Sequence, residues 1–96
     1  MPSIVLTDKA QSDLESIHEH YQGVIGTPGA TQVIATILET LQQLQRFPGS
    51  GRPSVAPDIR ELVLTRYPFV APYRFMHGQI QILRILHQRT ERSQDW

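Results

Sequence analysis

The spacing of apolar residues changes along this 96-residue chain from the period of a helix to the period of a strand. From Ala10 to Tyr21 an apolar residue recurs every three or four positions, which predicts an amphipathic helix. A broader stripe with the same spacing follows over residues 30–44. Each stripe covers one helix face, so both predicted helices need an apolar surface to pack on.

Short signals mark the helix ends. Thr7 offers a hydroxyl as the N-cap of the first helix. The stretch GVIGTPG, residues 23–29, predicts a break, with Thr27 as cap and Pro28 as the first residue of the second helix. The second helix should stop near Phe47, before a Pro-Gly pair. We therefore expect an antiparallel two-helix hairpin with a short glycine-containing link.

The remaining elements have the pattern of strands. Residues 3–6 predict a short first strand, and residues 60–65, 69–76 and 79–87 predict three more after a loop over residues 48–58. Gly78 can take the positive φ that a tight hairpin turn requires. The chain thus predicts an α+β fold, a helical hairpin on a three- to four-stranded antiparallel sheet, forming a single domain over residues 1–96.

Two details of the sheet follow from single residues. Pro72 cannot donate to a ladder, so we expect a bulge or an unpaired edge there. If Ile80 and Ile82 face the helices, period-two spacing places Arg84 on the helix side and His87 on the open face. An unpaired buried charge would be costly, so Arg84 is expected to be a structural cation paired with a carboxylate of the first helix, Asp13 or Glu15.

Composition and charge limit the classes of function. The chain has no cysteine, which excludes disulfides and thiolate chemistry. No apolar run reaches about 18 residues and no secretory leader is evident, so we expect a cytoplasmic protein without a membrane span. Residues 1–50 carry a net charge of −3, with two basic and five acidic residues; residues 51–96 carry +3, with seven arginines and four acidic residues. The arginine-rich half either meets an anionic partner or neutralises the acidic half.

Several segments together resemble the RelE/ParE superfamily of toxins from type II toxin–antitoxin systems. The resembling segments are residues 8–21, 44–54, 59–64, 67–75 and, above all, 80–89. The resemblance implies a growth-arresting protein that is held inactive by a cognate antitoxin, with which it can form a higher-order assembly. It also implies the helical-hairpin and sheet fold that the periodicity predicts.

The superfamily divides into two mechanisms, and the resemblance leaves both open. RelE-like members cut mRNA on the ribosome, whereas ParE-like members act on DNA gyrase. For cleavage, His87 would be the acid or base, and Arg66 and Arg60 would bind phosphate. The chain has no lysine after Lys9 and no tyrosine after His87, residues that nuclease members usually supply. We therefore expect action on gyrase, with RelE-like cleavage as the alternative and a non-toxic antitoxin-binding regulator as a third possibility.

Partner contacts are expected mainly from exposed cations. The candidate residues are Arg60, Arg66, Arg74, Arg89 and, in a polar tail over residues 90–96, Trp96. Tyr67 and Tyr73 could replace the missing tyrosine only if the fold brings them beside His87. His18 and His20 are two positions apart on a helix and cannot hold one ion from one face, so we expect neither a metal nor another cofactor.

Overall fold

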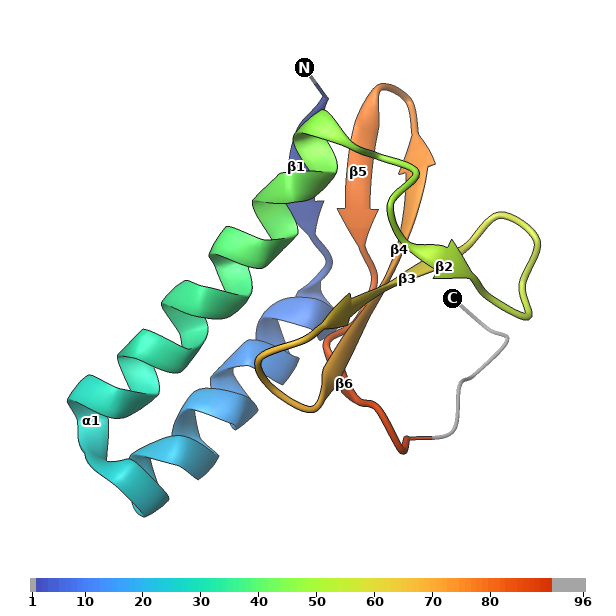
Figure 1. The fold of residues 1–96 in the computed structure, drawn as a ribbon. Helices are drawn as coiled ribbons and strands as arrows, with labels where there is room; N and C mark the ends of the chain where they lie inside the picture. Colours follow the sequence, from blue (N-terminus) through green and yellow to red (C-terminus); the bar gives the residue numbers. More distant parts are fainter. Residues whose placement is uncertain (1, 91–96) are drawn as a thin grey trace.

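The computed structural model describes residues 2–90 of the chain, which form an α+β fold. One helical element, α1, follows the first strand, and five further strands follow α1. The elements are β1 (Ser3–Leu6), α1 (Asp8–Arg46), β2 (Arg52–Pro53), β3 (Arg60–Leu64), β4 (Phe69–Met76), β5 (Gln79–Ile82) and β6 (Leu86–His87). Figure 1 shows α1 folded back on itself beside the sheet.

The helical element α1 begins at a side-chain cap and reverses at a single glycine. Thr7 Oγ1 accepts the backbone N–H of Ala10 at 3.1 Å, as the capping prediction requires. Within α1, only Gly26 has non-helical dihedral angles, with φ 86° and ψ 168°. Residues with a side chain rarely adopt this backbone conformation, whereas glycine adopts it readily. The expected break over residues 23–29 is therefore corrected: the helix continues to residue 25, and one residue makes the turn.

The turn divides α1 into an N-terminal arm, residues 8–25, and a C-terminal arm, residues 27–46, which run in opposite directions (Figure 1). Gln22 Nε2 donates to Thr27 Oγ1 at 2.9 Å across the turn. A second contact, 3.4 Å long, joins His18 Nε2 and Thr31 Oγ1. Instead of two separate helices, the chain has one element whose arms are held together at the kink.

The sheet is mixed, with strand order β1-β5-β4-β3-β2 and with β6 paired to β4 beyond the end of β5. The expectation of three or four antiparallel strands is corrected in number and in direction. β1 runs parallel to β5, whereas all other pairs are antiparallel. The helical hairpin returns the chain to the end of the sheet where β1 began (Figure 1). The first and third strands of the meander therefore share the direction of β1.

The β4–β5 turn matches its sequence signal. His77 and Gly78 have φ of 54° and 72°, and Met76 pairs with Gln79 on either side of them. Two central residues with positive φ make the hairpin turn that suits the twist of a sheet. The predicted positive φ at Gly78 is confirmed, and His77 shares that conformation.

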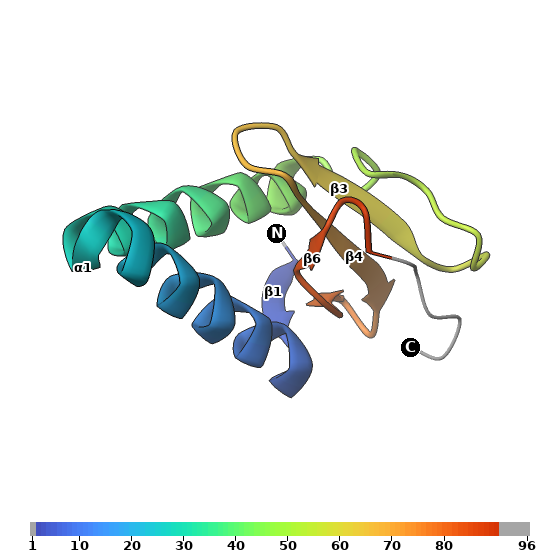
Figure 2. The ribbon, with the colours of Figure 1, turned by 90° about the horizontal axis from the view of Figure 1, so that it is seen from below.

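The core lies between α1 and one face of the sheet. The arms contribute Ala10, Ile17, Val33, Ile37, Leu41 and Leu44, and the sheet side contributes Leu62, Leu64, Ala71, Tyr73, Ile80, Ile82 and Ile85. Figure 2, seen from below, shows both arms on the same side of the strands. The helical stripes thus have the apolar partner that their spacing requires.

A bulge opposite Ala71, next to Pro72, changes the phase of the last strand. Tyr73 pairs with Ile82, but Val70 pairs with Leu86. Two residues, Arg84 and Ile85, therefore stand opposite Ala71 alone, which is the arrangement of a β-bulge. The expectation of a bulge or an unpaired edge at Pro72 is corrected: Pro72 pairs with Glu61 within an uninterrupted β4, and the extra residue lies on the neighbouring segment.

The extra residue overturns the expectation that His87 faces away from the helices. Period-two spacing holds only while a strand has no inserted residue, and each insertion moves the following side chains to the other face. Ile85 consequently joins the core with Ile80 and Ile82. His87 lies two positions further and shares a pocket with residues of α1. His87 is therefore on the helix side.

Candidate functional site

Arg84 forms a paired contact with Asp13 in the N-terminal arm. Its Nε donates to Asp13 Oδ2 at 2.7 Å and its Nη2 donates to Oδ1 at 2.9 Å. Asp13 Oδ2 also accepts the backbone N–H of Ile85 at 2.9 Å. The hydrogen bond to Asp13 raises the pKa of the Arg84 guanidinium, which stays charged. Of the two carboxylates considered from the sequence, Asp13 is the partner, and it joins α1 to the bulge.

Tyr73 and Arg60 hold the loop that follows α1. The hydroxyl of Tyr73 donates to the carbonyl of Pro48 at 2.6 Å and accepts the N–H of Gly51 at 2.9 Å. Arg60 Nη1 donates to the carbonyl of Gly51 at 2.8 Å. Tyr73 is 1% exposed, and its burial raises the pKa of its hydroxyl. Tyr73 therefore fixes the loop after α1 through these hydrogen bonds, and it does not lie beside His87.

Two further arginines lie on the sheet face that points away from α1. Arg52 Nη2 lies 3.1 Å from Glu61 Oε1, across the β2–β3 pair. Arg74 Nε donates to Gln81 Oε1 at 2.8 Å, across the β4–β5 pair. Each guanidinium is thus held by a cross-strand neighbour, which orders the cations on this face.

His87 borders a pocket between the N-terminal arm and the end of the sheet. The pocket has a volume of about 310 Å³. Its lining includes Ser16, His20 and Tyr21 from the arm and Pro68, Phe69 and His87 from the sheet side. The Phe69 and His87 rings meet edge to face, with centroids 6.1 Å apart. We call this site the His87 pocket.

The predicted catalytic residues do not converge. His87 is paired with Phe69, whereas Arg60 is paired with Tyr73. Phe69 and Tyr73 are four residues apart on one strand, which at about 3.3 Å per residue separates them by about 13 Å. Arg60 and His87 therefore belong to different parts of the sheet.

The other candidates lie closer to the His87 pocket or outside the described residues. Arg66 is exposed in the turn between β3 and β4, and Arg89 is exposed two residues after His87. Tyr67 packs edge to face on Tyr21, with ring centroids 6.1 Å apart, and so borders the same region. Trp96 lies outside residues 2–90.

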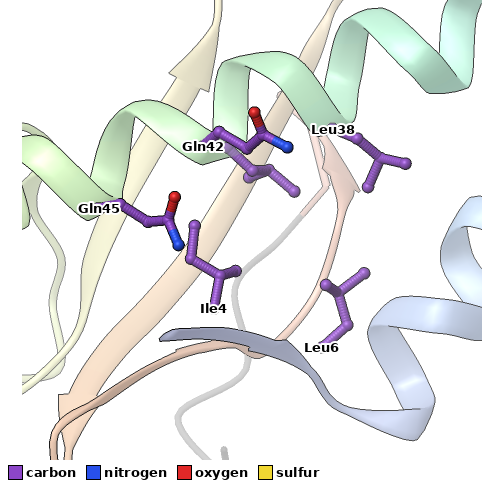
Figure 3. A pocket seen from close by; sticks show the side chains of 6 residues that line it. Ile4, Leu6, Leu38, Gln42 and Gln45 are labelled. Atoms are coloured by element: carbon purple, nitrogen blue, oxygen red, sulfur yellow. The ribbon is translucent and has the colours of Figure 1, made fainter. Parts of the chain in front are cut away.

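A second pocket lies between β1 and the C-terminal arm, and sequence reasoning missed it. Ile4, Leu6, Leu38, Leu41, Gln42 and Gln45 line a volume of about 280 Å³ (Figure 3). The apolar stripe over residues 30–44 predicts helix positions that pack in a core. Gln42 and Gln45, which lie near Leu41 in the sequence, were the signal that this part of the helix reaches the edge of the sheet. β1 is the last strand on this side of the sheet. We call this site the β1 groove.

Two classes of site are absent from the part of the chain that the structure describes. Within residues 2–90, no three histidine, aspartate or glutamate side chains gather as a metal site would require. In the same range, no helix has the length and apolar character needed to cross a membrane.

The chain is similar to known toxins in sequence and in fold. The family described as "ParE toxin of type II toxin-antitoxin system, parDE" matches residues 4–92. A solved structure described as "Chromosomal ParDE TA system from P. aeruginosa" has 43% sequence identity and a TM-score of 0.84, covering 91% of this chain and 96% of that chain. The Sinorhizobium fredii protein called "Putative toxin Y4kP" is 38% identical over 58 residues, 60% of this chain. That match spans 59% of the relative, less than two thirds of its length.

Proposed function

Because this chain belongs to the ParE toxin family of type II toxin–antitoxin systems, we propose that it arrests growth by acting on DNA gyrase. Members of this family belong to toxin–antitoxin systems, so we expect a cognate antitoxin as a partner. Family membership does not identify the target of the toxin. The geometry of the candidate residues supports the choice of gyrase. Since gyrase works on chromosomal DNA, the proposed site of action is the cytoplasm.

The separation of Arg60 from His87 is the observation that favours binding over cleavage. Cleavage of RNA through its 2′-hydroxyl needs a base, an acid and a cation around one phosphate. Arg60 donates a hydrogen bond to the carbonyl of Gly51, and the Tyr73 hydroxyl donates one to the carbonyl of Pro48. His87 lines a pocket together with His20, but neither Arg60 nor Tyr73 lies beside them. A toxin that acts by binding to a protein needs no such group of catalytic residues.

RelE-like cleavage remains the second candidate, and the position of His87 is what favours it. The imidazole is exposed and has Phe69 on one side. Arg66 lies in the turn that precedes Phe69 and could neutralise a phosphate. This alternative requires His87 and His20, which share one pocket, to act as acid and base, or a second group to come from the ribosome.

The β1 groove is the proposed docking site for the antitoxin. β1 is an edge strand, and its outer backbone groups are available to an added strand. Ile4 and Leu6 are partly buried beside Leu38, which is 38% exposed. An extended antitoxin segment could pair with β1 and place alternate apolar side chains in the groove.

Two assays run in parallel test the target. Purified toxin is added to DNA gyrase in a supercoiling assay, and toxin expression is followed by mapping mRNA ends in cells. The proposal predicts inhibited supercoiling and intact messages. Unchanged supercoiling at saturating toxin would overturn it, and message cuts that disappear in His87→Ala would establish the second candidate. A folded protein that leaves growth unaffected would indicate the non-toxic regulator.

The antitoxin site is tested with a matched pair of variants. Leu38→Glu places a charge in the β1 groove and should weaken antitoxin binding about tenfold or more, as for a central interface residue. Gln43→Glu makes the same charge change at an exposed position of the same arm outside the groove. Equal affinities for the two variants would exclude the groove as the docking site.

A further inference from the structure

The His87 pocket combines ring surfaces with hydrogen-bonding groups. Tyr21 and Phe69 contribute aromatic rings, and His20 and His87 contribute imidazoles. Ser16 adds a hydroxyl to the lining. A volume of about 310 Å³ is at the small end of ligand sites, which hold about 300–1,000 Å³. The pocket therefore suits one planar ring system and is too small for an extended cofactor.

His87 has one nitrogen engaged, and its other nitrogen has no hydrogen-bond partner among residues 2–90. The backbone N–H of Arg89 donates to His87 Nδ1 at 3.2 Å. With Nδ1 as acceptor, the neutral ring carries its hydrogen on Nε2, which is then a donor. A hydrocarbon ring entering the pocket would bury donors such as Nε2–H and the Ser16 hydroxyl without partners, which is unfavourable. A ring that bears its own acceptors would satisfy them.

Two exposed arginines lie close in sequence to residues that line the pocket on the sheet side. Arg66 stands two residues before Pro68, and Arg89 stands two residues after His87. Both are exposed. Guanidinium groups bind phosphate through paired hydrogen bonds. The position of these cations favours a ligand whose ring is attached to an anionic group.

The acidic residues of the N-terminal arm do not oppose this charge. Asp13 is already paired with Arg84. At about 100° of rotation per residue, Glu15 and Glu19 lie more than about 100° around the helix from the centre of the face that lines the pocket. Among the residues that the structure describes, the charges nearest in sequence to the sheet side of the pocket are therefore those of Arg66 and Arg89.

We propose that the His87 pocket binds a nucleotide. The base lies among the rings of Tyr21, Phe69 and the two imidazoles, and its acceptor atoms meet the donors of the lining. The phosphate lies at Arg66 and Arg89. The ligand is either a free nucleotide or one nucleotide unit of a single-stranded nucleic acid, which share this chemistry. The site is separate from the proposed antitoxin groove and does not depend on action on gyrase.

Titrations of the full chain with small probes test the site. The probes are adenosine monophosphate, adenosine, inorganic phosphate, a short thymidine oligonucleotide and phenylalanine amide. Binding is followed by the NMR shifts of the Ser16 and Tyr21 amides and of the His20 and His87 rings. We expect the monophosphate to bind more tightly than adenosine or phosphate alone, with shifts at those groups.

Matched variants locate the ligand. His20→Ala or His87→Ala should weaken binding of the monophosphate about fivefold or more, the loss expected for a base that stacks on a ring. His18→Ala, on another side of the same arm, should leave binding unchanged. Arg66→Ala combined with Arg89→Ala should weaken the monophosphate and spare adenosine, whereas Arg46→Ala should affect neither.

Each outcome decides for or against the site. Oligonucleotide binding tighter than the monophosphate would support a nucleic-acid ligand, and equal affinity would support a free nucleotide. Phosphate binding as tightly as the monophosphate would show charge attraction alone and overturn the proposal. Phenylalanine amide binding as tightly as the monophosphate, unaffected by the arginine variants, would mark a pocket for a protein side chain. Absence of shifts at millimolar probe would exclude the site, while a gyrase assay would be unaffected by that result.

Discussion

Leu83 donates its backbone N–H to the carbonyl of Pro72 at 2.8 Å, and Pro72 has no N–H to return. In the hydrogen-bonded pairs of an antiparallel ladder the two opposite residues exchange both bonds, so the Leu83 carbonyl needs another donor. The Thr7 hydroxyl donates to it at 2.8 Å while accepting the N–H of Ala10. One side chain thus caps the helix and completes the sheet beside the bulge.

Thr7→Val should destabilise the protein more than the loss of a helix cap alone. The change keeps the shape of the side chain but removes the acceptor for Ala10 and the donor for Leu83. A lost cap costs about 1 kcal/mol, and a part-buried carbonyl without a partner adds about 1–3 kcal/mol. Urea unfolding measures the difference. Thr7→Ser keeps the hydroxyl, and a Ser variant as unstable as the Val variant would contradict this role.

Asp13→Ala should cost more stability than Arg84→Met. Asp13 accepts from two guanidinium nitrogens and from the N–H of Ile85, so its removal leaves three donors without that partner. The Asp13 and Arg84 side chains are 16% and 33% exposed, so solvent screens the pair, and we expect a loss of about 1–3 kcal/mol. Arg84→Met keeps the apolar stem. A double-mutant cycle in urea measures the coupling, and a value near zero would show that the pair does not tie α1 to the bulge.

Tyr73→Phe should be destabilising at neutral pH and progressively less so above about pH 10. Burial raises the pKa of Tyr73 in the folded state, so its stabilising contribution is complete below the unfolded value of about 10. Above that pH the unfolded chain releases the proton first, and the contribution falls as the pH approaches the folded pKa. Unfolding free energies of both proteins across this range give the comparison. Parallel pH curves would contradict the assignment.

Gly51→Ala should disturb the loop that Tyr73 and Arg60 hold. A Cβ at Gly51 would lie 2.6 Å from Tyr73 Cε1, 2.7 Å from its hydroxyl oxygen and 3.0 Å from the carbonyl oxygen of Glu61. Tyr73 is packed in the core, so relief requires backbone movement, with a cost of about 1–3 kcal/mol. Gly49→Ala has nothing within 4 Å of the added Cβ and is the matched control. Equal melting temperatures for the two variants would show that the loop adjusts freely.

Local signals predicted most elements and the family. The cap at Thr7, the first strand and the positive φ at Gly78 depend on a few adjacent residues, and each is confirmed. The resemblance to RelE/ParE toxins is confirmed by the match over residues 4–92. These features could be predicted because side chains a few positions apart determine them.

The pockets could not be predicted in the same way. The His87 pocket joins the arm containing Ser16 to the strand containing His87, and the β1 groove joins the first strand to the end of α1. The parallel pairing of β1 with β5 was missed for the same reason. Contacts between residues so distant in sequence depend on how the helical hairpin returns the chain to the sheet.

The sequence by itself determined that two amphipathic helical arms must cover a sheet, because apolar spacing specifies which face of each element is buried. Tertiary structure decided where His87 points. Pro72 removes one ladder bond, and the neighbouring strand inserts one residue there. Since side chains alternate with a period of two, that residue carries His87 to the helix side, a consequence visible only once the two strands are paired.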